Sequence, residues 1–451
     1  MTKNLTVGDP ALLIVGFTIP LLIGNLFQQF YNMADAFIVG RTIGVQALAA
    51  VGCTGSVMFF ILGFVWGFTQ GASIIASQCF GAGDYPGVRR SFAVSIVLGI
   101  GVTLLLTGPG VFFARPFLIL LNTPAEILDA AYRYMVVIFW GIAAAVMFNL
   151  ISNIMRAVGD SRTPLVFLVI ACVINIILDY VFILVFHTGV EGAAYATVIA
   201  QVISGLLCVP VILKRMPVLR LTREDWRFTW SDMSRHIRMA FPMGFQMSII
   251  AIGAIVLQFA LNGLGTAAVA AYTAAQKIDM VAGMPMNSFG LTMTTYVAQN
   301  YGARRIDRIR QGLLRCLIIS GAFSILIGIV FILMGHKLAA FFIAGDPAAV
   351  SLAHIFLRVN GSCYLILSIL LICRQSLQGL GNSLVPTIAG FMELVMRSFA
   401  GVILARYFGF IGVCFANPLA WLGAAIPLLT AVVLTMKRLN RVMMAERRLP
   451  G

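Results

Sequence analysis

Charged residues are scarce in this chain of 451 residues. Only 10% of the residues are Asp, Glu, Lys or Arg, and 60% are hydrophobic. A soluble domain carries about 25% charged residues, so this chain has too little polar side-chain surface to face water. The composition, with a mean hydropathy of +0.98, excludes a soluble protein and indicates one embedded in a membrane.

The signatures of enzymes and metal sites are also missing. The 8 Cys residues form no CxxC pair and have no His partners at zinc spacing, so we interpret them as small buried hydrophobic residues. No P-loop lysine signature is present, so ATP hydrolysis does not drive this chain directly. We predict that the protein is not an enzyme and needs no cofactor. If it transports, it draws on an ion gradient or runs downhill.

Long apolar runs dominate what is present. About 20 apolar residues cross a bilayer, and continuous runs predict helices rather than the alternating strands of a barrel. The sequence therefore predicts an all-α polytopic membrane protein with twelve spans. These spans are residues 11–35, 45–78, 91–113, 131–155, 164–186, 190–213, 237–262, 266–299, 313–334, 350–375, 384–406 and 410–436.

The net charge of +15 is distributed unevenly about these spans. Of the 31 Lys and Arg residues, 23 fall in the tails and in the loops on the same side as the tails, and six fall on the opposite side. Basic loops face the cytoplasm, so both termini are predicted to be cytoplasmic. The basic residues mark the topology, and we expect no nucleic-acid partner.

An internal repeat organises the chain at an offset of about 221 residues. Residues 44–50 align with 265–271, and residues 78–82 align with 299–303. Each half then holds six spans, and an even number gives both halves the same orientation, which is a parallel pseudo-two-fold repeat. The predicted domains are an N-lobe (1–213), a basic cytoplasmic connector (214–236) and a C-lobe (237–451). Two bundles related in this way are typical of alternating-access transporters.

Acidic residues inside membrane spans are functional candidates because they are costly to bury there. Asp35 ends a polar stripe with Asn25, Gln28 and Asn32, which lie within an arc of roughly 80° on a helix; Gln29 flanks it. Amides alone are explained equally well by hydrogen bonds between packed helices. The carboxylate favours a functional site.

A second acid, Asp179, lies one turn after Asn175 in the fifth span, so both side chains share a face. Thr197 and Gln201 form a polar face in the sixth span. Carboxylate, amide and hydroxyl oxygens suit Na⁺ as well as proton storage. Two carboxylates in one low-dielectric site cannot both ionise cheaply, so we expect Asp179 and Asp35 to hold a proton or a cation.

The second half lacks these acids. At the offset of the repeat, Leu257 takes the place of Asp35, and Gly401 that of Asp179. Acids that served only to join helices would be needed in both halves, so we place the ion site in the first half.

Other charged residues of the second half have a different interpretation. Glu393 and Arg397 are four residues apart in the eleventh span, which predicts a neutralised intramembrane ion pair with a structural or gating role. Lys277 and Asp279 are two residues apart and point to different faces.

Taken together, the Pro20–Asp35 segment, the Gly-Asp-Ser-Arg-Thr-Pro motif at 159–164, the Asn-x-x-x-Asp motif at 175–179 and the Gly-Ala-Ala-Tyr-Ala-Thr motif at 192–197 resemble multidrug and toxic compound extrusion (MATE) transporters. The resemblance covers nearly the whole chain. It implies an antiporter that exports organic, often cationic and amphipathic, compounds in exchange for H⁺ or Na⁺. We expect a monomer in a prokaryotic inner membrane.

The resemblance also implies roles for individual residues. In members with an N-lobe ion site, two aspartates, an asparagine and a threonine couple the ion, and these fall on Asp35, Asp179, Asn175 and Thr197. A possible Na⁺ would bind the same four residues. Some other branches carry a glutamate early in span seven, where this chain has Gln246 and no acid. The residues expected to line the substrate cleft are Asn25, Gln28, Gln29, Asn32, Gln201 and Gln246.

One alternative function stays open at this point. Lipid-linked oligosaccharide flippases of the same superfamily share the architecture, but they tend to have a basic central cavity. The intramembrane acids favour drug efflux. A scaffold or passive channel would lose no ion-coupled flux on neutralisation of Asp35.

Overall fold

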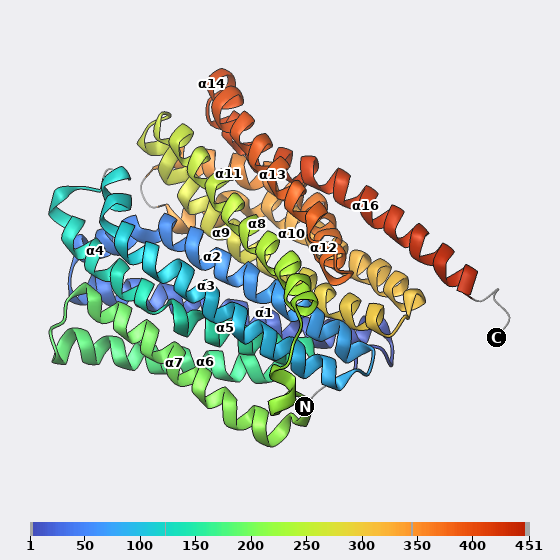
Figure 1. Cartoon of the computed structure of the whole chain (residues 1–451). Coiled ribbons are helices and arrows are strands. Elements are labelled where there is room, and N and C mark those ends of the chain that lie inside the picture. The colour runs from blue at the N-terminus through green and yellow to red at the C-terminus, as the bar shows by residue number, and fades with distance from the viewer. Residues whose placement is uncertain (1–2, 122, 344–345, 447–451) are drawn as a thin grey trace. The chain divides into compact units, whose positions relative to one another are not determined.

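The computed structural model describes residues 3–121, 123–343 and 346–446, and every regular element in these ranges is helical (Figure 1). The helices of the first half are α1 (Pro10–Thr42), α2 (Val45–Gly81), α3 (Tyr85–Leu120), α4 (Ala125–Trp140), α5 (Ile142–Ala157), α6 (Arg162–Tyr180), the π-helical turn η1 (Val181–Val185) and α7 (Val190–Arg215). The connector contains two 3₁₀ turns, η2 (Pro217–Leu219) and η3 (Arg223–Trp226). The helices of the second half are α8 (Trp230–Asn262), α9 (Thr266–Gly302), α10 (Ile306–Phe342), α11 (Pro347–Ser362), α12 (Tyr364–Gly379), α13 (Leu384–Phe399), the π-helical turn η4 (Ala400–Leu404), α14 (Ala405–Phe408), α15 (Phe410–Cys414) and α16 (Ala416–Glu446).

The helices confirm the predicted multi-span architecture. Among the described residues, nine helices or continuous helical stretches are long and apolar enough to cross a membrane, and the bent pairs α4–α5 and α11–α12 raise the number to eleven. The one remaining predicted span, 266–299, falls on α9, a helix of 37 residues. It is less apolar than the others because Asn, Ser, Thr and Gly residues accompany Lys277 and Asp279. Every predicted span thus lies on helix.

The two halves repeat their irregularities as well as their helices. The α4–α5 pair bends by 47° at Gly141, and the α11–α12 pair bends by 51° at Cys363, 222 residues later. The π-helical turns η1 and η4 follow α6 and α13 in the same way. Mid-helix changes of this kind have local causes and frequently lie at functional sites, so their recurrence indicates that the repeat extends to backbone geometry.

The Gly-Asp-Ser sequence at 159–161 recurs as Gly-Asn-Ser at 381–383, and helix ends explain both. Gly159 and Gly381 have φ values of +85° and +89°, a left-handed conformation that glycine adopts without steric cost. The residue before each N-cap serine satisfies an amide of the first helical turn: Asp160 accepts a hydrogen bond from the backbone NH of Thr163 at 3.0 Å, and Asn382 accepts one from Val385 at 3.2 Å. The motif therefore encodes a tight helix–helix connection in each half.

The chain divides into two compact units. Within the described residues, unit 1 consists of Pro20–Ser248 and the stretch before Leu5, and unit 2 consists of Leu5–Ile19 and the stretch from Ile249 onward. These limits fall inside α1 and α8, whereas the predicted domain limits lie in the connector. The start of α1 accordingly packs in unit 2, where Arg308 donates a hydrogen bond to the carbonyl oxygen of Gly8 at 2.8 Å.

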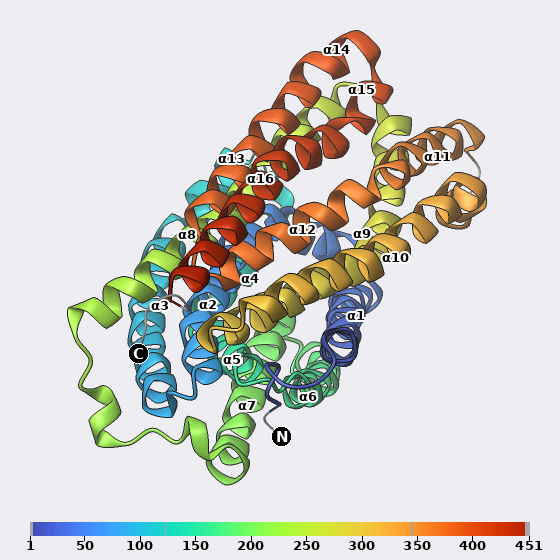
Figure 2. The same cartoon turned by 90° about the vertical axis from the view of Figure 1, so that its right-hand side faces the viewer.

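Each unit has its own apolar core. In unit 1, α2 packs on α3, α4 and α5, and α7 packs on α4, α5 and α6; these helices run from blue to green in Figure 1. In unit 2, α12 packs on α9, α10 and α16, and α13 packs on α16 (Figure 2). Packing in these two cores fixes the positions of the helices, and with them the polar residues described next.

Candidate functional site

Two aspartates from α1 and α6 lie together inside unit 1. Asp35 is 9% exposed, and Asp179 is completely buried. Their carboxyl groups lie close enough for the two charges to interact. Two neighbouring buried carboxylates repel each other, so the arrangement favours binding of a proton or a cation.

The two other predicted ion-site residues adjoin this pair. Asn175 lies one turn before Asp179 on α6 and is completely buried. Its Nδ2 donates to Oγ1 of Thr197 on α7 at 3.4 Å, across the interface where α6 and α7 pack. The structure thus brings the four residues predicted from sequence into one cluster, which we call the acid site: Asp35, Asn175, Asp179 and Thr197.

Several oxygen atoms of the acid site accept no hydrogen bond from the described residues. Within the described part of the chain, Asp35 Oδ1, Asn175 Oδ1 and both carboxyl oxygens of Asp179 have no hydrogen-bond partner. No Lys or Arg of the described residues forms an ion pair with either aspartate. Buried oxygens of this kind are costly unless they meet a proton or a cation.

This donor set fits a small hard cation better than a transition metal. No group of three or more His, Cys, Asp and Glu side chains close enough to hold a metal ion occurs in the described ranges. A bound Na⁺ would therefore need the amide oxygen of Asn175 and the hydroxyl of Thr197 in addition to the two carboxylates. Protons would need only the carboxylates.

Two tyrosines next to the acid site were missed by the sequence analysis. Tyr31, one turn before Asp35 on α1, is 9% exposed, and Tyr134 on α4 is 8% exposed. The hydroxyl groups of both tyrosines lie close enough to Asp35 and Asp179 to feel the charges of the two carboxylates. The i, i+4 spacing from Asp35 was a usable signal for Tyr31; nothing in the sequence pointed to Tyr134.

The predicted cleft-lining residues differ in exposure. On α1, Asn32 is exposed and its Nδ2 donates to Gln29 Oε1 at 3.4 Å. Asn25, Gln28 and Gln29 are half-buried on the same helix, as is Gln201 on α7, whereas Gln246 on α8 is 3% exposed. Their role in lining a substrate cleft stays a prediction.

The sequence analysis predicted an ion pair between Glu393 and Arg397, and the predicted partner of Glu393 was wrong. Glu393 on α13 forms its ion pair with Arg374 on α12, and both side chains are buried. The i, i+4 spacing places Arg397 on the same side of α13, but a buried carboxylate pairs with the charge that the neighbouring helix brings to it. The Arg397 side chain lies instead along Gly253 of α8, where an added Cβ would be 3.4 Å from Arg397 Nη1.

The remaining charged residues of α9 have separate surroundings. Asp279 Oδ1 accepts a hydrogen bond of 2.5 Å from the Tyr364 hydroxyl on α12, and Lys277 is exposed. The two side chains point to different faces, as predicted.

The chain matches the MatE family twice, over residues 20–181 and 242–403. The two matches are offset by the period of the internal repeat and together cover more than half of the chain. This agreement supports the origin of both halves in one six-helix unit.

Two similar proteins have the name probable multidrug resistance protein. The chain is 29% identical over 315 residues to the probable multidrug resistance protein YpnP of Bacillus subtilis, with 68% of each chain covered. It is 24% identical to the probable multidrug resistance protein NorM of Thermotoga maritima, over 91% of this chain and 88% of that protein.

A solved structure shares the fold over its full length. The crystal structure of a MATE protein in the bent conformation superimposes with a TM-score of 0.91 and 24% identity, covering 98% of this chain and 99% of that one. MATE transporters use no cofactor, in agreement with the sequence analysis. The chain belongs to the MatE family and is a membrane transporter of the multidrug exporter class, not an enzyme.

Proposed function

We propose that this transporter is a secondary antiporter that exports organic, amphipathic cations in exchange for H⁺ or Na⁺ by alternating access. The observation that carries the proposal is the acid site: two neighbouring buried carboxyl groups, with no ion-paired Lys or Arg among the described residues. A cationic side chain would neutralise the pair permanently. Without one, the charge of the pair depends on what binds to it.

Exchange follows if ion and substrate prefer different states of the acid site. Each proton or Na⁺ that binds removes one negative charge from the Asp35–Asp179 pair, which lowers the cost of closing α1, α6 and α7 around it without water. A cationic substrate prefers the state in which a carboxylate is uncompensated. Each ligand then shifts the conformational equilibrium by its differential affinity for the two states. In this proposal the moving parts are the predicted lobes, residues 1–213 and 237–451.

The proposed setting is a monomer in a prokaryotic inner membrane with both termini in the cytoplasm. The strong excess of Lys and Arg on one side of the spans supports the orientation. The names of similar multidrug resistance proteins support a drug-like substrate. An organic cation is the substrate class that the uncompensated carboxyl groups favour.

The test is substrate efflux from proteoliposomes under separately imposed H⁺ and Na⁺ gradients. A cationic dye should leave the vesicles when one gradient is imposed, and Asp35→Asn and Asp179→Asn should each abolish this flux. The matched control is Asp129→Asn, because Asp129 is an exposed acid of the same unit that pairs with Arg115 at 3.2 Å. Gradient-driven efflux at the wild-type rate in either acid-site variant would refute the proposed coupling role.

The same vesicles test the flippase alternative. A lipid-linked oligosaccharide flippase would move a fluorescent pyrophosphate-linked lipid between leaflets and leave the dye in place. Dye transport without lipid scrambling favours the antiporter. The opposite result replaces it with the flippase.

A further inference from the structure

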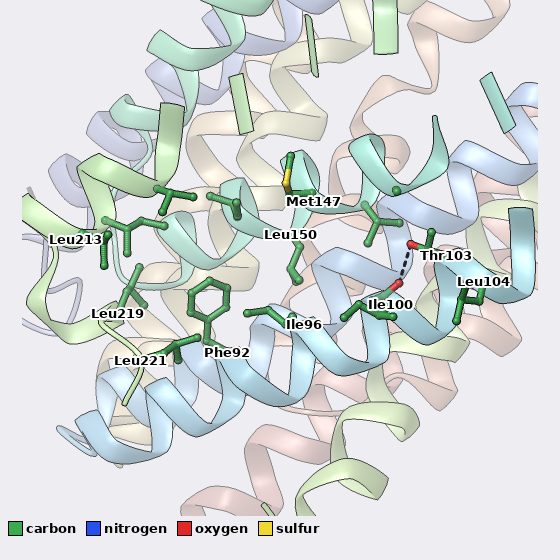
Figure 3. A pocket seen from close by; sticks show the side chains of 16 residues that line it. Phe92, Ile96, Ile100, Thr103, Leu104, Met147, Leu150, Leu213, Leu219 and Leu221 are labelled. Carbon is green, nitrogen blue, oxygen red and sulfur yellow. Dashed lines mark hydrogen bonds between the residues drawn. The ribbon is translucent and has the colours of Figure 1, made fainter. Parts of the chain in front are cut away.

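Unit 1 contains an apolar groove that is separate from the acid site. It has a volume of about 590 Å³ and is lined by 16 residues from α3, α5, α7 and the connector (Figure 3). On α7 its nearest residue, Val209, lies twelve positions after Thr197, about 18 Å along a helix. Ion coupling does not account for this groove.

The walls of the groove follow from how the helices pack. α3 and α7 both pack on α5, and both also contact η2 of the connector. α5 therefore forms the floor with Val146 and Leu150, and Leu219 closes the end at the connector. Leu104 and Ile100 on α3 are 70% and 57% exposed, and Leu213 on α7, towards the connector, is 52% exposed, so the groove is open at both ends.

The lining offers a ligand almost nothing to hydrogen-bond. Thr103 carries the one side-chain hydroxyl among the lining residues, and it donates to the carbonyl oxygen of Gly99 at 2.8 Å (Figure 3). The other lining side chains are apolar. Such a groove selects a hydrocarbon chain over a drug with polar groups.

The length of the groove matches one leaflet of a bilayer. Its lining on α3 extends from Phe92 to Leu104, and twelve residues of helix span about 18 Å. The hydrocarbon core of a bilayer is about 30 Å thick, so one leaflet contributes about 15 Å. An acyl chain that lies along α3 would fill the groove from end to end.

The end at the connector is basic. Four exposed basic residues lie at this end of the groove: Lys214, Arg215, Arg220 and Arg223. None of them forms an ion pair within the described residues. Of the two acids in this stretch, Asp225 pairs with Arg89 at 3.2 Å and Glu224 is exposed.

The same stretch has the aromatic residues of a membrane surface. Trp226 is 45% exposed, and Trp230 is 74% exposed. Tryptophan gathers at the level of the lipid headgroups, so the basic side chains lie where a phosphate would be.

We propose that this groove binds an anionic phospholipid, with one acyl chain along α3, α5 and α7 and its phosphate at the basic residues of the connector. The apolar lining sets the affinity for the chain. The four unpaired cations select an anionic headgroup over a zwitterionic one, since each Lys or Arg near a membrane surface attracts acidic lipid about five-fold.

The experiment counts phospholipids bound to the intact transporter by native mass spectrometry, with phosphatidylglycerol and phosphatidylcholine of identical acyl chains. We expect one phosphatidylglycerol to be retained in preference to phosphatidylcholine. Arg220→Gln should reduce this preference about five-fold. The control for charge is Arg310→Gln, an exposed arginine on α10.

A second variant tests the chain-binding part. Ala143 is an exposed small residue of the lining, and Ala143→Phe should fill the groove and remove the retained lipid. Ala322→Phe, an equally exposed position on α10, should keep it. Equal retention of both lipids, or unchanged retention in Ala143→Phe, would mean ordinary lipid contact and overturn the proposal. Displacement of the lipid by a transported dye would assign the groove to the substrate and would overturn it as well.

Discussion

Glu393 on α13 and Arg374 on α12 form an ion pair whose side chains are 6% and 7% exposed. A buried pair of this kind joins two helices of unit 2 through charge. It also leaves each partner dependent on the other, because a single buried charge without its counter-ion is far more costly than no charge at all.

The first prediction is that Glu393→Gln destabilises the protein by about 3–5 kcal/mol, since Arg374 would remain buried and unpaired. Glu393→Gln combined with Arg374→Gln should recover most of this loss. Thermal unfolding of the purified protein in detergent measures both. The control is Asp307→Asn, because the exposed Arg305–Asp307 pair should contribute about 0–1 kcal/mol.

If the double variant is as unstable as the single one, the pair is not the source of the effect. If Arg397→Gln rescues Glu393→Gln instead, Arg397 is the true partner in the membrane. Double-variant cycles separate these two outcomes.

This ion pair illustrates what sequence can and cannot predict. Helix positions followed from apolar runs and charge placement, and the cluster of Asp35 with Asp179 followed from polar faces and the asymmetry of the repeat. The partner of Glu393 did not, because helical spacing reveals only neighbours on the same helix. Tyr134 and Arg374 reach their sites from other helices through tertiary packing, which no local pattern encodes.

The second prediction concerns a close helix contact in unit 1. A Cβ at Gly67 of α2 would lie 2.2 Å from the carbonyl oxygen of Met243, and one at Gly71 would lie 2.7 Å from Cα of Ala240, both on α8. Small residues four positions apart let helix backbones approach in membranes. Gly71→Ala should therefore destabilise the protein by about 1–3 kcal/mol.

The control for this contact lies on the same helix. Gly55 is exposed, and a Cβ there would meet nothing within 4 Å. Gly55→Ala should be neutral or slightly stabilising, because alanine favours helix by about 1 kcal/mol over glycine. Equal melting temperatures for Gly55→Ala and Gly71→Ala would show that α8 does not pack this closely on α2.

The third prediction concerns orientation. The positive-inside rule places the connector in the cytoplasm and the start of α4 outside. After the free cysteines are replaced, an impermeant maleimide applied to intact cells should label Glu126→Cys and not Arg223→Cys, although both positions are exposed. The reverse pattern would invert the topology and, with it, the direction of transport.

The fourth prediction concerns the anchor of the connector on α3. Burial of Asp225 opposes its charge, but hydrogen bonds from Thr222 and the charge of Arg89 outweigh this and lower the pKa of Asp225. Because the folded pKa lies below the unfolded value of about 3.9, the stabilisation is present above that value and is lost as the pH falls through the lowered pKa. Asp225→Asn should remove it at neutral pH.

Hydrogen exchange at the Thr222 amide measures this anchor, because the amide donates to Asp225 Oδ2 at 2.7 Å. Wild-type protection should persist from pH 7 to about pH 4 and then fall, whereas Asp225→Asn should be unprotected throughout. Glu224→Gln, at the exposed neighbouring acid, should behave as wild type. Full protection in Asp225→Asn would show that the 3₁₀ turn holds without the carboxylate.

The last prediction concerns competition between ion and substrate at the acid site. If the neutral and the charged states of Asp35 and Asp179 favour different conformations, binding of a cationic substrate must release a proton or displace Na⁺, and the reciprocal effect follows by linkage. Substrate affinity should fall when the pH is lowered or when Na⁺ is added, by a factor of about 5–150. In Asp35→Asn the affinity should respond less to both. Calorimetry in buffers of different ionisation enthalpy, with and without Na⁺, measures the released proton and the affinity together. A wild-type affinity for the substrate that is independent of both pH and Na⁺ would rule out direct competition at these carboxyl groups. A substrate that binds at the carboxyl groups must bind more weakly once a proton or Na⁺ occupies them.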